Sequence, residues 1–79
     1  MNERTIIGSR IAIARRAAHL NQNELGRAIG VSGQTISNWE NARYVPSATD
    51  IVSLVHVLGC SASFLLGLSD TLSITVKRP

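Results

Sequence analysis

Cysteine, aromatic residues and long apolar runs are all scarce in this chain, and the scarcity of cysteine and of apolar runs each excludes a class of protein. A single cysteine, Cys60, cannot form an intrachain disulfide, which excludes a disulfide-stabilised scaffold. Cys60 follows Gly59 in an apolar stretch, so we interpret it as a small core residue rather than a reactive thiol. No apolar run is long enough to cross a membrane and no signal peptide is present, so we expect a cytoplasmic protein without a membrane partner.

The usual signatures of enzymes and metal sites are missing too. The sequence has no Gly-rich phosphate loop, no Cys/His pairs at metal-ligand spacing and no paired carboxylates. Neither His19 nor His56 has a second ligand or a nucleophile at a suitable spacing. We therefore expect a protein that is not an enzyme, with no catalytic residue, no metal, no cofactor and no small-molecule ligand.

Length and charge set the scale of the molecule and suggest a kind of partner. A chain of 79 residues forms one small domain, which buries only roughly 60 to 65% of the surface that its unfolded form exposes. The net charge is +3 and the isoelectric point is near 10.0, and seven of the eight basic residues are arginine. This mild basic excess is consistent with a nucleic-acid partner without demonstrating one.

The stretch from residue 20 to residue 47 predicts two short helices joined by a tight turn. Asn21 can cap the first of them and Glu24, three residues later, can return the bond to the Asn21 backbone. Gly30 supplies a permissive backbone between the helices, and Ser32 can cap the second.

The second of these helices has an unusual outer face. Gln34, Ser37, Asn38 and Asn41 recur at the spacing of one helical face, with Ile36 and Trp39 on the other side. Uncharged amides and hydroxyls both donate and accept hydrogen bonds, as the base edges of the DNA major groove require. The alternative is a polar face that only meets solvent.

Three further helices complete an all-α, compact bundle of five short helices. The first has apolar residues at helical spacing, the fourth begins after Ser47 and the fifth is a short run closed by Gly67. The apolar residues predicted to face the core are Ile7, Ile11, Ala14 and Ala18 in the first helix, and Ile51, Leu54, Val55 and Leu58 in the fourth.

The residues after the fifth helix depart from the helical period. LSITV, residues 72–76, is β-branched and alternating, which favours a strand. Three alternatives stay open for the tail over residues 69–79: a strand that pairs with a second copy, the start of a linker to a further domain, or a disordered segment. Phe64, Leu68, Ile74 and Val76 are candidates for self-association, with core packing as the alternative for Phe64.

With these features in place, the chain resembles the helix-turn-helix domain of the phage lambda-type repressor and Cro family, often called the XRE family. The resemblance covers about residues 6–68, and its specific core is NQxEL followed by GVSxxTISxWE. The matching segments are IGSRIAIAR (7–15), LNQNELGRAI (20–29), GVSGQTISNWE (30–40), residues 41–47 and LGCSASFLL (58–66).

This resemblance implies a sequence-specific, double-stranded DNA-binding transcriptional regulator. Residues 1–68 would form the DNA-binding domain, and the helix after Ser32 would read an operator through the major groove. A homodimer is expected to be weak in solution and tighter on DNA, because two half-sites need two such helices. Occupying the operator would block polymerase or a competing regulator, which makes the protein a repressor.

The resemblance and the helical positions together predict the residues of the site. We expect Gln34 to be the main base-reading residue, joined by Asn38, with Ser37 and Thr35 secondary and Gly33 lacking a side chain where relatives often place a reader. Phosphate contacts are predicted for Gln22, Ser32, Asn41 and Arg43. In the family, the pair equivalent to Arg15 and Glu40 forms a partly buried ion pair.

Two other classes of function stay open. One is a protein-interaction module, such as an antitoxin-like binder, on the same scaffold, and the other is a purely structural helical bundle. DNA binding predicts a basic rim around the polar face, whereas an interaction module predicts an exposed apolar patch. Ile13 bears on this choice, because its helical position points outward.

Overall fold

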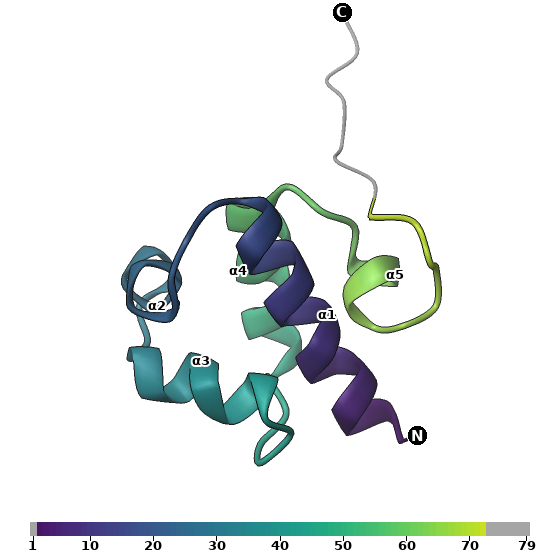
Figure 1. Cartoon of the computed structure of the whole chain (residues 1–79), viewed down its shortest axis with the longest axis horizontal. Helices are drawn as coiled ribbons and strands as arrows, with labels where there is room; N and C mark the ends of the chain where they lie inside the picture. Colours follow the sequence, from purple (N-terminus) through teal and green to yellow (C-terminus); the bar gives the residue numbers. More distant parts are fainter. Residues whose placement is uncertain (1, 73–79) are drawn as a thin grey trace, which may run out of the picture.

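The structure is a computed structural model that describes residues 2–72, and these residues form five α helices around one core (Figure 1). The helices are α1 (Glu3–Ala17), α2 (Gln22–Ile29), α3 (Gly33–Glu40), α4 (Ala48–Leu58) and α5 (Ala62–Leu65). The prediction of an all-α bundle of five short helices is confirmed, with α2 and α3 as the helix-turn-helix. The open alternatives for the tail concern residues 69–79, of which residues 73–79, including the candidates Ile74 and Val76, lie outside the described residues.

Local capping explains where the helices begin and end. Glu24 N–H donates to Asn21 Oδ1 at 2.7 Å while Asn21 N–H donates to Glu24 Oε1 at 2.8 Å, so two amides that α2 cannot pair internally are both bonded. Ser47 and Asp50 form the same reciprocal pair at the start of α4. α2 ends at Gly30, whose φ of 84° lies in the left-handed region that glycine adopts without a steric penalty.

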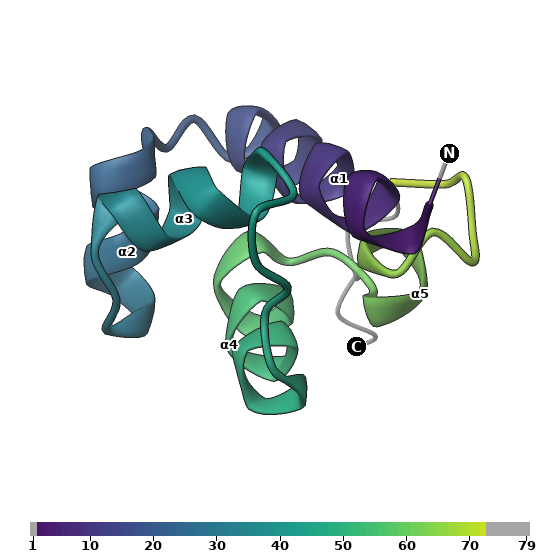
Figure 2. The same ribbon diagram turned by 90° about the horizontal axis from the view of Figure 1, so that it is seen from below.

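The core lies between α1, α3 and α4, with α2 and α5 closing its two ends (Figures 1 and 2). Cys60 is fully buried within it, as the sequence predicted. The residues that pack together in this core are Ile11, Ala14, Leu25, Ile36, Trp39, Ile51, Leu54, Leu58, Cys60, Phe64 and Leu65.

Phe64 belongs to this core, so of its two alternatives, core packing is confirmed and self-association is not. Only 3% of Phe64 is exposed, and the Arg10 guanidinium lies 4.4 Å from the centre of its ring. α5 is too short for a helical period to appear in the sequence. Only the packing in the structure therefore distinguishes its inner face from its outer face.

α1 crosses the C-terminal end of α3 at very short range. A methyl group at Gly8 would contact the Trp39 carbonyl oxygen and lie 2.8 Å from the Glu40 carbonyl oxygen. Both neighbours are backbone atoms, so a side chain at position 8 would push the two helices apart. Gly8 therefore sets the distance between α1 and α3.

The segment after α5 is held against α1 by a single arginine. Arg10 Nη1 donates to the carbonyl oxygens of Phe64 at 3.1 Å and Ser69 at 2.6 Å, and Nη2 lies 3.1 Å from Asp70 Oδ1. Leu72 also packs on the core. Packing against the helical bundle thus continues beyond residue 68, where the tail was expected to begin.

Candidate nucleic-acid interface

The polar face predicted for residues 34–41 lies on the outer side of α3. Ile36 and Trp39 anchor the inner side, with 0% and 5% of their surface exposed. α2 packs beside α3 (Figure 2), and a methyl group at Gly26 would lie only 2.6 Å from the Val31 carbonyl oxygen in the turn between them. This close approach holds the two helices of the motif together and fixes the direction of the α3 outer face.

Gln34 and Asn38 are joined on this outer face. Gln34 Nε2 donates to Asn38 Oδ1 at 3.1 Å, one helical turn away. The bond uses one of the two hydrogens of the Gln34 amide, and no other residue from 2 to 72 bonds to its oxygen or its second hydrogen. Those two groups are what a bidentate contact with adenine N6 and N7 needs. Asn38 therefore orients Gln34 and leaves the Gln34 amide able to form two further hydrogen bonds.

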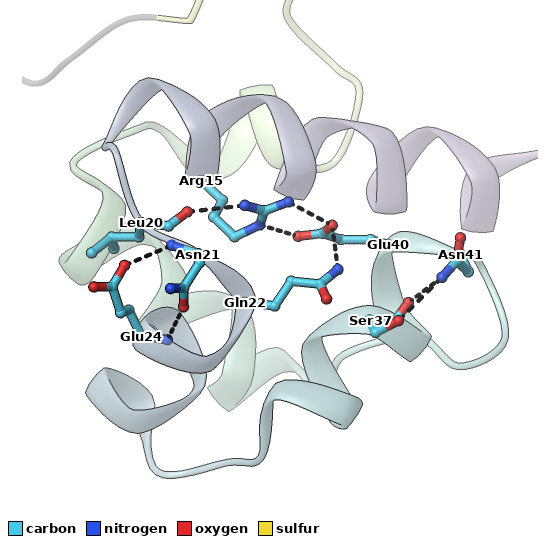
Figure 3. Close-up of polar contacts among 8 residues, drawn as sticks. All are labelled: Arg15, Leu20, Asn21, Gln22, Glu24, Ser37, Glu40 and Asn41. Atoms are coloured by element: carbon cyan, nitrogen blue, oxygen red, sulfur yellow. Dashed lines mark hydrogen bonds and ion pairs between the residues drawn. The ribbon is translucent and has the colours of Figure 1, made fainter.

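Ser37 and Asn41 are the other two polar residues of the α3 outer face. Asn41 Nδ2 lies 3.0 Å from the Ser37 carbonyl oxygen and 3.2 Å from Ser37 Oγ (Figure 3). Both bonds use the amide nitrogen, which is the atom that a phosphate oxygen would need as a donor. Through these two bonds Asn41 caps the end of α3. The phosphate contact predicted for Asn41 would have to compete with them.

Ser32 and Thr35 occupy the first turn of α3. Ser32 Oγ accepts from Thr35 N–H at 3.0 Å, and the two hydroxyl oxygens are also 3.0 Å apart. The first backbone amides of α3, at Gly33 and Gln34, have no carbonyl partner within the helix and carry the positive end of its dipole. A phosphate could therefore bind to this turn at Ser32. The Thr35 hydroxyl lies next to the Ser32 hydroxyl rather than in line with Gln34.

Arg15 and Glu40 form an ion pair between α1 and α3 (Figure 3). Arg15 Nε lies 2.6 Å from Glu40 Oε2, Nη2 lies 3.1 Å from Oε1, and only 11% and 7% of the two side chains are exposed. The hydrogen bond to Glu40 raises the pKa of Arg15, against the opposing effect of burial, so the guanidinium stays charged. Arg15 Nη1 also donates to the Leu20 carbonyl oxygen at 2.9 Å.

Gln22 joins this pair from α2. Its Nε2 donates to Glu40 Oε1 at 3.0 Å, so the three elements α1, α2 and α3 meet at one carboxylate (Figure 3). The sequence predicted a phosphate contact for Gln22 and gave no sign of this bond, because residues 22 and 40 become neighbours only in the folded chain. The bond holds the start of α2 against the end of α3.

Arg43 lies in the loop after α3 and is exposed. Its backbone N–H donates to the Asn38 carbonyl oxygen at 2.9 Å, while its side chain forms no hydrogen bond or ion pair within residues 2–72. The guanidinium is therefore free to meet an anion next to the outer face of α3.

Exposed apolar side chains are spread over several elements. Ile13 is 45% exposed, so its predicted outward direction on α1 is confirmed. Leu68, after α5, is 79% exposed. The other large exposed apolar residues are Tyr44, Val45, Val52, Val57 and Leu66.

Other kinds of site are absent from the described part of the chain. Residues 2–72 contain no group of three or more His, Cys, Asp or Glu side chains that could hold a metal ion, and no pocket forms on the described surface. None of the five helices is both long and apolar enough to span a membrane.

Comparison with known proteins agrees with this geometry. A family model described as helix-turn-helix matches residues 11–65. Repressor protein C2 of Salmonella phage P22 is 34% identical over 61 residues, covering 77% of this chain, and the 26 kDa repressor protein of Escherichia phage HK022 is 35% identical over 80 residues, covering 96%. The crystal structure of the P22 c2 repressor with a synthetic operator superposes with a TM-score of 0.76 at 33% identity, covering 81% of this chain and 97% of that one.

The two phage repressors are longer proteins. This chain spans 28% of the length of the P22 protein and 34% of the length of the HK022 protein. The similarity thus concerns one part of each repressor.

Proposed function

Because this chain belongs to the helix-turn-helix family, we propose that it is a sequence-specific, double-stranded DNA-binding transcriptional regulator of the phage repressor type. The observation that carries the proposal is the outer face of α3, where Gln34 and Asn38 present hydrogen-bonding groups without charge. The similarity of the chain to a repressor whose structure was determined with operator DNA supports the same proposal.

The proposed mechanism places α3 in the major groove. Gln34 would contact a base pair through its free amide groups, with Asn38 holding it in position and Ser37 beside it. Ser32 at the first turn of α3 and Arg43 after its last turn would bind phosphates on either side. The buried contacts of Glu40 would keep the reading helix at a constant angle to α1 and α2.

Operator binding would occur as a homodimer on two half-sites about one DNA turn, ~34 Å, apart. A dimer of so small a domain is weak by itself and is reinforced when one DNA molecule holds both copies. The bound dimer would act by obstructing polymerase or a competing regulator. We place this activity in the cytoplasm of a bacterial host, where the DNA is.

Selection from a pool of random duplexes tests this proposal. The enriched sites are then measured by gel shift at several salt concentrations. We expect a two-fold symmetric motif and an affinity whose logarithm falls linearly with the logarithm of the salt concentration. If no duplex is enriched, the proposal fails, and exposed apolar side chains such as Ile13 then favour the protein-interaction module.

A further inference from the structure

Gly33, the first residue of α3, lies directly beneath a side chain from α2. A methyl group at Gly33 would lie 2.9 Å from Asn23 Cγ and 3.2 Å from Asn23 Cα, with Asn23 Oδ1 closer still. The Asn23 amide therefore occupies the space into which the first side chain of α3 would otherwise project.

Asn23 differs from its neighbours in the first turn of α2. Asn21 and Glu24 are committed to the capping box, and Gln22 is bonded to Glu40. Asn23 is exposed, and its amide forms no hydrogen bond to any other described residue. It is the one side chain of this turn whose donors and acceptor are all available to a ligand.

We propose that Asn23 is a specificity-determining residue, whose amide reads the edge of a base next to the one read by Gln34. In this arrangement an α2 side chain replaces the reader that Gly33 cannot supply. The inference rests on the proposed DNA-binding function, because it names a further residue of the same site.

Two physical arguments favour a base over a phosphate as the ligand. The N-terminal residues of the recognition helix are the ones that contact base edges, and the Asn23 amide lies against the first of them. An asparagine amide matches adenine N6 and N7 with two hydrogen bonds, whereas it brings no charge to a phosphate.

The first test compares the wild-type chain with Asn23→Ala in parallel selections from random duplexes. We expect the variant to lose its preference at one base pair and to bind the best wild-type site about tenfold more weakly. Binding to unrelated duplexes and the salt dependence should stay the same. His56→Ala, which shortens an exposed side chain on α4, serves as the control and should leave the selected motif unchanged.

A second variant tests the contact itself. Gly33→Ala should displace the Asn23 amide, and it should remove the preference at the same base pair as Asn23→Ala does. In the Asn23→Ala background, Gly33→Ala should then change the selected motif little further, because the displaced group is already absent. Thermal melts of each variant establish that it is folded.

The outcomes separate this inference from the proposed function. If the wild-type chain enriches a motif and Asn23→Ala enriches the same one, Asn23 reads no base and the inference is wrong. An equal loss on all sequences would assign Asn23 to a phosphate and also overturn the inference. If the wild-type chain enriches no duplex, the proposed function fails and the inference fails with it.

Discussion

At the scale of single residues, the most consequential side chain is the carboxylate of Glu40. It accepts from Arg15 on α1 and Gln22 on α2 while belonging to α3, and it is almost completely buried. A buried charge is stable only while its partners remain, because an unpaired ion in the interior has lost its hydration without compensation. The Arg15–Glu40 ion pair and the Gln22 bond thus help to fix α3 relative to α1 and α2.

Removing only one member of that pair should be more harmful than removing both. We expect Arg15→Met to lower the free energy of unfolding by about 3 to 5 kcal/mol, because Glu40 is left buried with one amide donor. The double variant Arg15→Met with Glu40→Leu should lose less. Urea denaturation of the three proteins measures this, and equal, near-zero effects would mean that the pair adds nothing to stability.

Gln34 carries the central prediction for base reading. Gln34→Ala should cost about 1 to 3 kcal/mol on the selected operator and relax the preference at one base pair. Asn38→Ala should relax the same base pair to a smaller extent, since it frees Gln34 from the 3.1 Å bond that orients it. Competition gel shifts with single-base operator variants measure both effects. Unchanged discrimination in Gln34→Ala would remove Gln34 from the base-reading set.

Cys60 should behave as a buried thiol with a suppressed ability to ionise. Burial raises its pKa, so the folded state keeps the proton at a pH where the unfolded thiol, with a pKa of about 8.5, has begun to lose it. This preference stabilises the fold fully below about pH 8.5 and is lost as the pH rises through the pKa of the folded state. A thiol reagent at pH 8 should react only as fast as the chain opens, and rapid labelling in buffer without denaturant would contradict this.

At the scale of helices, the sequence is informative wherever the cause of a structure lies within four residues. The capping pairs of Asn21 with Glu24 and of Ser47 with Asp50, and the polar stripe through Gln34, all depend on such short spacings. They were therefore predictable without coordinates.

Contacts between segments far apart in the sequence could not be predicted from such short spacings. The bonds from Gln22 to Glu40 and from Arg10 to Ser69 require the relative placement of whole helices, which no local pattern encodes. The choice between core packing and self-association for Phe64 stayed open for the same reason. The ion pair between Arg15 and Glu40 was anticipated only through family resemblance, and its geometry came from the structure.

The crossing of α1 over α3 gives a prediction at this scale. Alanine favours a helix over glycine by about 1 kcal/mol, yet Gly8→Ala should destabilise the protein by about 1 to 3 kcal/mol. The added methyl group meets two backbone carbonyl oxygens that cannot rotate away. Ser9→Ala, at the exposed neighbouring position, is the control and should change stability little. A Gly8→Ala protein with a higher melting temperature would show that α1 and α3 can separate at no cost.

At the scale of the whole molecule, the two ends of the bundle have different properties. The helix-turn-helix lies at one end, and α5 with the segment that Arg10 holds lies at the other (Figures 1 and 2). Leu68 belongs to the second end and is largely exposed. Self-association through that end would leave α3 of both copies uncovered.

Leu68 is therefore the residue to test for the proposed dimer. We expect Leu68→Glu to reduce the cooperativity of operator binding while leaving the melting temperature of the monomer unchanged, because the side chain is exposed and packs little on its own chain. Ile13→Glu, an exposed apolar position on α1, is the matched comparison and should leave cooperativity intact. The reverse pattern would move the interface to α1.

The contact between Asn23 and Gly33 constrains how a lineage of such proteins can change its target. Most positions on the outer face of α3 can be substituted one at a time, since their side chains are not part of the core. A side chain at position 33 would displace the Asn23 amide, because both would occupy the same volume. Substitutions at these two positions are therefore coupled, and we expect relatives that carry a side chain at position 33 to redirect or replace the asparagine at position 23.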